Sequence, residues 1–301
     1  MIPISVQTGG VTEVWGMDEG YRMIKEAGFD GVDANLDHLL THDAIIRRER
    51  ADFVTAGDFL QYFRPWKDAA EKHGLQNFQA HAPFPCVVPG GGEYNDYLME
   101  ALRRIIAGCR YIGCSRLVIH PFFFPYDHQM DKKTEWEMNI EKYASLIDIA
   151  RENDVTICLE NMFGRYRGKI YAAICSDLEE ACRYVDTLND LAGERRFAFC
   201  LDTGHLLLLG LDVKNAILKL GNRIETLHVH DNNGIGDQHL APYMGILDWG
   251  RFTEGLKEIG YRKPLSFETF NAMNVFDREL APDLLSLIAR TGRIFARRIE
   301  G

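Results

Sequence analysis

The chain has 301 residues, of which 46% are hydrophobic and 26% are charged, an ordinary composition for a globular protein. Its formal net charge of −10 disfavours a surface built to bind nucleic-acid phosphates. No apolar run approaches the roughly 18 residues of a membrane span, and the start, 1–6, lacks the features of a signal peptide. We therefore expect small-molecule partners, with no nucleic acid and no membrane.

Short apolar runs alternate with helical segments along the chain. The runs predict strands near 2–6, 29–34, 76–81, 116–120, 155–160, 197–202, 224–230 and 264–269. The segments between them predict helices near 17–27, 57–73, 94–112, 135–152, 177–190, 212–220, 249–259 and 281–298. Glycines stand where many of these helices should end, at Gly28, Gly74, Gly113, Gly221 and Gly260. This alternation predicts an α/β fold, a (β/α)8 TIM barrel occupying residues 1–301 as a single domain.

The cysteines indicate the cellular compartment, and the loops exclude the usual nucleotide-binding motifs. Seven cysteines are present, an odd number, and no two have C-x-x-C spacing. Cys158 and Cys200 fall inside predicted buried strands, where a thiol behaves as a small hydrophobe. We expect a reducing, cytoplasmic location. No G-x-G-x-x-G or Walker A loop follows any predicted strand, which removes the usual nucleotide-binding motifs.

Six predicted strands carry a histidine or a carboxylate at their C-terminal ends. These residues are His81, His120, Glu160, Asp202, His228 together with His230, and Glu268. In a TIM barrel this end of the strands carries the active site. Converging carboxylates repel one another unless a positive charge lies between them. The pattern therefore predicts one divalent ion (Mn, Mg, Co or Zn) held by Glu160, Asp202, His228 and Glu268.

Plainer interpretations compete with this one. Each strand-end residue can be a buried polar group satisfied by the backbone, and Asp202 can cap a helix instead of aiming at a site with His205. Prolines follow in His81-Ala82-Pro83 and His120-Pro121, where they stop the strand. We expect both histidines to face the same site as the carboxylates.

Two loop features complete the candidate site. Asp237 and His239 form a D-x-H pair after the seventh predicted strand, which can chelate a second metal, grip a substrate hydroxyl, or simply be a solvated loop. Arg165 lies in a short basic stretch just after Glu160. It can neutralise a substrate phosphate or carboxylate, although a solvated loop explains it equally well.

These motifs together resemble a known family. The chain resembles the xylose-isomerase-like TIM-barrel superfamily, a sugar phosphate isomerase/epimerase group related to endonuclease IV. The segments that carry the resemblance are His81-Ala82-Pro83-Phe84, Val118-Ile119-His120-Pro121, Leu159-Glu160-Asn161, Leu201-Asp202-Thr203-Gly204-His205, His228-Val229-His230-Asp231-Asn232, Asp237-Gln238-His239 and Phe267-Glu268. They span most of the barrel and are more specific for the superfamily than for one reaction.

The ketose 3-epimerases of this group imply roles for individual residues. In them two glutamates, an aspartate and a histidine hold one metal, which Glu160, Asp202, Glu268 and one histidine of the seventh strand match. His228 fits the H-x-x-D spacing with Asp231, while His230, two residues on, is the alternative ligand.

Other positions complete or depart from the epimerase pattern. His205 matches a histidine that contacts substrate oxygens. Tyr166 stands where these enzymes carry a further substrate glutamate, and Gly234-Ile235-Gly236 stands where they carry an arginine. The departures leave the particular sugar open.

The resemblance implies a metal-dependent sugar or sugar phosphate isomerase or epimerase of carbohydrate metabolism, acting through a metal-stabilised enediolate. Glu160 and Glu268 would be its catalytic base and acid. The implied substrate-binding residues are His81, His120, His205, His230, Asp237, His239 and Arg165. A homo-oligomer is compatible with the sequence but not specified by it.

Three alternatives stay open at this point. One is a zinc phosphodiesterase at abasic DNA like endonuclease IV, for whose nine ligands the chain offers a match at every position: His81, His120, Glu160, Asp202, His205, His228, Asp237, His239 and Glu268. The others are an inosose- or dehydroshikimate-type dehydratase and a ligand-binding barrel without activity. The number of bound metals separates them, since one ion fits the isomerase or dehydratase and three fit the nuclease.

Overall fold

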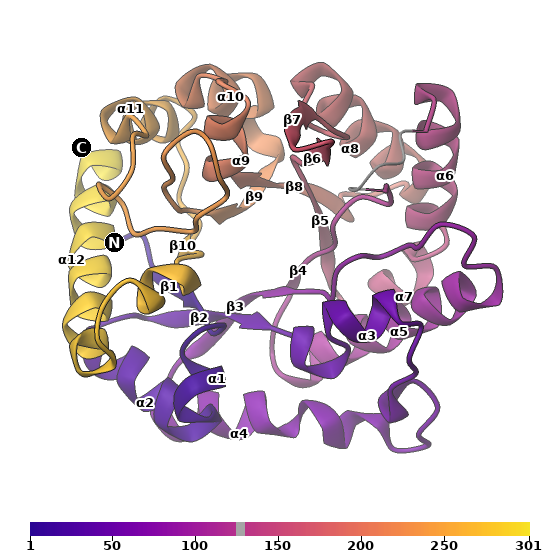
Figure 1. Cartoon of the computed structure of the whole chain (residues 1–301), viewed down its shortest axis with the longest axis horizontal. Coiled ribbons are helices and arrows are strands. Elements are labelled where there is room, and N and C mark those ends of the chain that lie inside the picture. The colour runs from indigo at the N-terminus through magenta and orange to yellow at the C-terminus, as the bar shows by residue number, and fades with distance from the viewer. Residues whose placement is uncertain (125–129) are drawn as a thin grey trace. The chain divides into compact units, whose positions relative to one another are not determined.

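The computed structural model describes residues 1–124 and 130–301. Within these residues the main sheet has eight strands in the order β10-β1-β2-β3-β4-β5-β8-β9 (Figure 1). Their bounds are β1 Ile4–Gln7, β2 Gly31–Asn35, β3 Gln76–His81, β4 Arg116–Val118, β5 Thr156–Glu160, β8 Phe197–Asp202, β9 Ile224–His228 and β10 Leu265–Phe267. Residue Val6 lies opposite Phe267 in a parallel register, and Val229 bridges to Phe267 from the other side. The strands therefore follow chain order and return to the first, which is the topology of the predicted (β/α)8 TIM barrel.

The predicted helices are largely confirmed. The longer ones are α2 Met17–Ala27, α4 Arg64–His73, α5 Glu93–Tyr111, α6 Lys132–Ala144, α7 Ile147–Glu152, α8 Leu178–Ala192, α10 Val213–Leu220, α11 Trp249–Glu258 and α12 Ala281–Glu300. The single helix predicted over 135–152 is two, because the Ser145 hydroxyl donates to the Lys142 carbonyl and competes with the backbone where α6 ends. The segment 57–73 begins as the 3-10 helix η3 (Phe59–Phe63), and Pro65, which lacks an N–H, lies in the first turn of α4.

Several short helices and strands were not predicted from the sequence. They are the short helices α1 (Thr12–Trp15), α3 (His42–Ile46) and α9 (Thr203–Leu208), further 3-10 turns, and the antiparallel hairpin of β6 (Phe163–Tyr166) and β7 (Lys169–Ala172). The hairpin turns at Arg167 and Gly168, which both have positive φ, at +49° and +78°. Its charged residues are uncommon in strands, which is why the sequence favoured a loop there.

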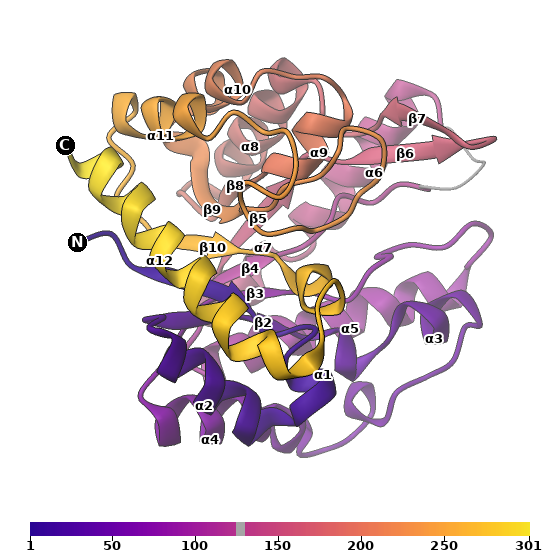
Figure 2. The same cartoon turned by 60° about the vertical axis from the view of Figure 1, so that its left-hand side comes forward.

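Contacts divide the chain into two compact units. The first unit comprises Met1–Ala34, Asp68–Phe78 and Cys200–Gly301. Its helices α10, α11, α12 and α2 lie side by side in that order (Figures 1 and 2). Helix α12 packs very closely on the strands, because a Cβ at Gly292 would lie 2.7 Å from the Phe267 ring and 3.0 Å from Ile4. The rings of Trp249 and Phe295 stack at 5.2 Å between α11 and α12.

The second unit comprises Asn35–Lys67 and Gln79–Phe199. Its longest helix, α5, lies against the 3-10 helices η2 (Asp52–Val54) and η3, where a Cβ at Gly108 would meet the Phe63 ring at 2.2 Å. Helices α6 and α8 join through Trp136 and Tyr184, whose rings stack at 4.2 Å. The one-domain expectation for residues 1–301 stays a prediction.

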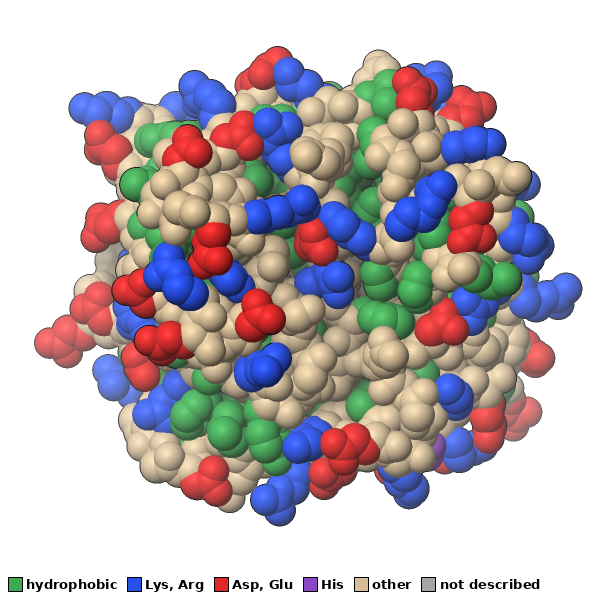
Figure 3. Space-filling model, turned by 180° about the vertical axis from the view of Figure 1, so that it is seen from behind, with side chains coloured by type: hydrophobic (Ala, Val, Ile, Leu, Met, Phe, Trp, Pro, Cys, Tyr) green, Lys and Arg blue, Asp and Glu red, His purple; other side chains and the backbone are tan. Residues whose placement is uncertain are grey.

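Three further features concern the cysteines, the length and polarity of the helices, and the charges on the surface. All seven cysteines are buried, and none of them forms a disulfide bond. None of the helices in 1–124 and 130–301 is long and apolar enough to cross a bilayer. Acidic and basic side chains are interspersed over the face drawn in Figure 3. A cytoplasmic location stays a prediction.

Candidate metal centre

Three of the four predicted metal ligands meet in the first unit. Asp202 ends β8, His228 ends β9 and Glu268 directly follows β10, so parallel strands deliver all three from their C-terminal ends. One ligand atom from each lies within 4.8 Å of the others, and all three residues are buried. The structure thus brings these three residues together, and their part in holding a metal stays a prediction.

The two nitrogens of His228 face different carboxylates. Its Nδ1 lies 3.5 Å from Glu268 Oε2 and 3.9 Å from Asp202 Oδ2. Its Nε2 lies 3.4 Å from Oδ2 of Asp33, which is fully buried. A histidine with one nitrogen toward a cation site and the other toward a carboxylate is the usual arrangement of a metal ligand.

Asp202 caps a helix and also lies beside another histidine of the predicted site. As the N-cap of α9, it accepts a 2.6 Å hydrogen bond at Oδ1 from the His205 backbone N–H. The same carboxylate also meets Nε2 of His230, at 3.0 Å from Oδ1 and 2.9 Å from Oδ2. Capping and participation in the site are therefore compatible, because a carboxylate has acceptor capacity for several partners.

Asp237 and His239 lie against Glu268 and His205 rather than in a solvated loop. His239 is buried, its Nε2 lies 2.9 Å from Asp237 Oδ2, and its Nδ1 lies 3.3 Å from Glu268 Oε2. His205 approaches from α9, with Nε2 3.7 Å from Asp237 Oδ2. The solvated-loop interpretation of this pair is therefore wrong.

Burial and charge oppose each other in this pair. Burial lowers the pKa of His239, but the carboxylates of Glu268 and Asp237 outweigh it and hold that pKa well above the ordinary value. Burial raises the pKa of Asp237, but His239 and His205 hold it well below the usual range. The negative charge of Asp237 and Glu268 is therefore balanced by the neighbouring imidazoles.

The loop that carries this pair is organised by Asp231. Its Oδ1 accepts from the backbone of Asn232 and Leu247, and its Oδ2 accepts from the backbone of Tyr243 and the Trp249 indole N–H. Asp231, which sequence spacing paired with His228, is thus a structural residue that fixes the β9–α11 loop.

Two residues beside the site were not predicted. Gln7 at the end of β1 donates a 2.6 Å hydrogen bond from Nε2 to Glu268 Oε1. Asp33, in β2, faces His228 as described above. The sequence did contain a signal for both. Gln7 directly follows the first apolar run and Asp33 lies within the second, so each is a polar residue near a strand end, like the six that were identified.

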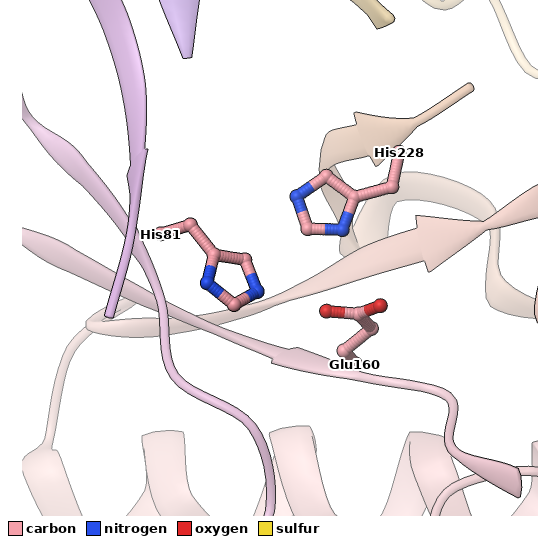
Figure 4. Close-up of side chains that lie close together, drawn as sticks. All are labelled: His81, Glu160 and His228. Atoms are coloured by element: carbon pink, nitrogen blue, oxygen red, sulfur yellow. The ribbon is translucent and has the colours of Figure 1, made fainter. Parts of the chain in front are cut away.

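The second unit holds a compact group of its own, of His81, His120 and Glu160. The Nε2 atoms of His81 and His120 lie 3.0 Å apart, and Nε2 of His120 lies 3.1 Å from Glu160 Oε2. The Phe84 ring packs edge-on against His120 at 4.7 Å. Figure 4 draws His81 and Glu160 at the ends of β3 and β5, together with His228 of the first unit. Two imidazoles and a carboxylate are again a metal-type donor set.

Arg165 lies on a separate element, the hairpin of β6 and β7. Its guanidinium lies 5.6 Å from the Phe163 ring centre, and the residue is half-buried. It has no acidic partner within residues 1–124 and 130–301. Its predicted part in binding substrate stays a prediction.

The curated relatives include both a sugar epimerase and an endonuclease. An uncharacterized protein of Methanocaldococcus jannaschii is 26% identical over 213 residues, 69% of this chain and 70% of that protein. A D-psicose 3-epimerase of Enterocloster bolteae is 27% identical over 54% of this chain and 52% of its own length. A probable endonuclease 4 of Metamycoplasma arthritidis is 30% identical over 44% and 47%. The chain thus spans about half the length of this epimerase and of this endonuclease.

Solved structures and a family model agree on the fold. The 3-keto-D-glucoside 4-epimerase of E. coli superposes with a TM-score of 0.72 at 17% identity, over 97% of this chain and 100% of that one. An L-ribulose 3-epimerase gives 0.70 at 17% identity, over 100% and 99%. A zinc-containing IOLI protein gives 0.66 at 17% identity, over 97% of each chain. Residues 21–290 match the family model described as xylose isomerase-like TIM barrel, so this chain belongs to that family.

Proposed function

We propose that the protein is a divalent-metal-dependent sugar, or sugar phosphate, isomerase or epimerase. The carrying observation is the buried group of Asp202, His228 and Glu268, whose ligand atoms lie within 4.8 Å of one another. Similarity to a D-psicose 3-epimerase supports a sugar substrate. Glu160, at the end of β5, is the fourth proposed ligand.

The residues fit a divalent ion. Carboxylate oxygens and one imidazole nitrogen suit Mn, Mg, Co or Zn. Buried carboxylates that approach one another are costly unless a cation compensates them, and the ion-pair partners described for Asp202 and Glu268 within the first unit are imidazoles. When bound, the ion polarises the carbonyl and hydroxyl oxygens of adjacent carbons and so stabilises an enediolate.

The two glutamates divide the proton transfer in this proposal. Glu268 is oriented by Gln7, which donates to Oε1 and leaves Oε2 toward His228 and His239. Glu160 ends β5, which is not a neighbour of β10 in the strand order. Carboxylates from non-adjacent strands can reach two faces of one substrate, so one removes the proton and the other returns it.

The remaining polar residues would orient the substrate. This set comprises His81, His120, His205, Asp237, His239 and Arg165. Imidazole nitrogens and a carboxylate can form hydrogen bonds with sugar hydroxyls, while Arg165 suits a phosphate. We expect the protein to act without nucleic acid or membrane partners.

Solvent-deuterium exchange into a panel of ketoses and ketose phosphates, followed by NMR, tests the proposal. The wild type should label one carbon of at least one substrate. Glu160→Gln and Glu268→Gln should each lose turnover by about 10²–10⁴-fold, whereas the exposed control Glu254→Gln should not. Undiminished exchange in either site variant, with metal still bound, would remove that glutamate from proton transfer.

A second candidate is supported by the other polar groups. His81, His120 and Glu160 form one metal-type set, and His205, Asp237 and His239 form another. A probable endonuclease 4 is also among the relatives. An abasic-site phosphodiesterase would bind three ions per chain and cut abasic duplex, so elemental analysis and a cleavage assay separate it from the isomerase.

A further inference from the structure

His230 lies two residues beyond the end of β9, with its ring fully buried. Its main chain is held at both polar atoms by Thr203, whose hydroxyl donates to the His230 carbonyl at 2.7 Å and accepts from its N–H at 3.0 Å. Its Nε2 lies 2.9–3.0 Å from both oxygens of Asp202. The ring therefore has little freedom to turn.

Two neighbours lie close against the ring. The ring of His239 stacks on it at 4.1 Å with an interplanar angle of 13°. The α9 residue Gly204 also approaches it, because an added Cβ there would come 2.0 Å from Cε1 and 2.5 Å from Nδ1 of His230. Only glycine leaves room for the ring, which gives the Gly204 of the Asp202-Thr203-Gly204-His205 segment a physical reason.

The space that Gly204 leaves for the His230 ring, called the slot below, bears on two possible roles for His230, ligand or positioning residue, because His230 lies near Asp202 and His205 and also near His239 and Glu268. Its Nδ1 lies close to α9 at Gly204 and has no hydrogen-bond partner within the described residues. Its Nε2 is engaged by Asp202. His228, in contrast, has Nδ1 directed toward Glu268 and Asp202. The two histidines of the H-x-H segment therefore differ in what their nitrogens can bind.

We propose that His230 is a positioning residue for the metal centre and not one of its ligands. Resting on the metal-dependent function proposed above, this inference assigns His230 the task of fixing the rotation of the Asp202 carboxylate and the plane of His239. A hydrogen-bonded ligand binds metal more tightly, because its orientation is set before the ion arrives. Gly204 serves the same purpose, because its missing side chain leaves the space that the His230 ring occupies.

The test is a titration of the metal-free protein with Mn²⁺ and with Co²⁺. His230→Ala should weaken binding by about 10–100-fold, the usual effect of losing a partner that orients a ligand. His230→Gln keeps an N–H that can reach Asp202, so it should retain most of the affinity. The Co²⁺ absorption spectrum of His230→Gln should match the wild type, because the ligand set is unchanged. An altered spectrum, with one imidazole fewer by X-ray absorption, would make His230 a ligand and overturn the inference.

A double-mutant cycle tests the slot itself. Gly204→Ala should weaken metal binding as His230→Ala does, because its Cβ displaces the ring. In the His230→Ala background the same change should have little further effect. Gly57→Ala is the matched control, since a Cβ there meets nothing within 4 Å. Additive losses from Gly204→Ala and His230→Ala, in variants whose circular dichroism matches the wild type, would contradict the slot.

The outcomes separate the two proposals. A wild type that binds no divalent ion overturns both the proposed function and the role of His230. A wild type that binds one ion, combined with a changed Co²⁺ spectrum in His230→Gln, overturns only the role of His230.

Discussion

Replacement of Asp33 by asparagine should weaken metal binding without removing any metal ligand. Asp33 Oδ2 lies 3.4 Å from Nε2 of His228, and both residues are fully buried. A carboxylate behind a ligating histidine fixes the ring and raises its basicity. Asparagine preserves the size of the side chain but removes its charge, so the change weakens the contact of Asp33 with Nε2 of His228.

The expected loss is about 10–100-fold in affinity, the range for such partners of ligating histidines. That corresponds to about 1.4–2.7 kcal/mol, since each tenfold change in an equilibrium constant is about 1.4 kcal/mol. Removing the His228 ligand itself, as in His228→Ala, should cost more. The ordering wild type, Asp33→Asn, His228→Ala is therefore the quantitative signature.

Isothermal titration of the metal-free variants with Mn²⁺ or Zn²⁺ measures this ordering, with thermal unfolding of each variant to confirm folding. Asp248→Asn is the matched control, because Asp248 is exposed and caps α11, a position that asparagine also fills well. Affinity that is unchanged in Asp33→Asn but lost in His228→Ala would refute the argument that Asp33 orients the ligand.

Three further predictions follow from separate features. Arg165→Ala should raise KM for a phosphorylated substrate and leave KM for the unphosphorylated sugar unchanged; equal effects on both would show that Arg165 does not contact a phosphate. Abasic duplex DNA should not bind below micromolar concentration at physiological salt, and tight, steeply salt-dependent binding in a fluorescence titration would support the nuclease instead. Burial raises the pKa of Asp30, but bonds from Arg293 and the Ile4 N–H outweigh it and hold that pKa below its ordinary value. This stabilisation is present above the unfolded pKa of about 3.9 and is lost as pH falls through the lower folded value. Asp30→Asn should therefore cost about 1 kcal/mol or less at pH 7 and progressively less as the pH is lowered below the folded pKa, which urea unfolding over a series of pH values would show.

The fold was predictable because glycine and apolar periodicity report on the backbone directly. Gly28, Gly74, Gly113, Gly221 and Gly260 all have positive φ, as expected of residues that end helices. Strand ends predicted the neighbourhood of Asp202, His228 and Glu268 because parallel strands of a barrel deliver their C-terminal residues to one end.

The site was less predictable where local backbone geometry decides. Alternation along a strand places His228 and His230 on one side, but β9 ends at His228, so the period no longer fixes the direction of the second ring. Spacing also made Asp231 a partner of His228, whereas it anchors the following loop. Hydrogen bonds across the fold, such as Gln7 to Glu268, have no signature in spacing.

Metal-dependent hydrogen exchange tests the central proposal most directly. The protein is stripped of metal with a chelator, incubated with ketoses and ketose phosphates in D₂O, and then assayed again after addition of one equivalent of Mn²⁺, Mg²⁺, Co²⁺ or Zn²⁺. The proposal predicts no exchange without metal and restored labelling of a single substrate carbon with one ion per chain. Labelling that proceeds equally without metal, or three ions per chain with cleavage of abasic DNA and no labelling of any sugar, would contradict it.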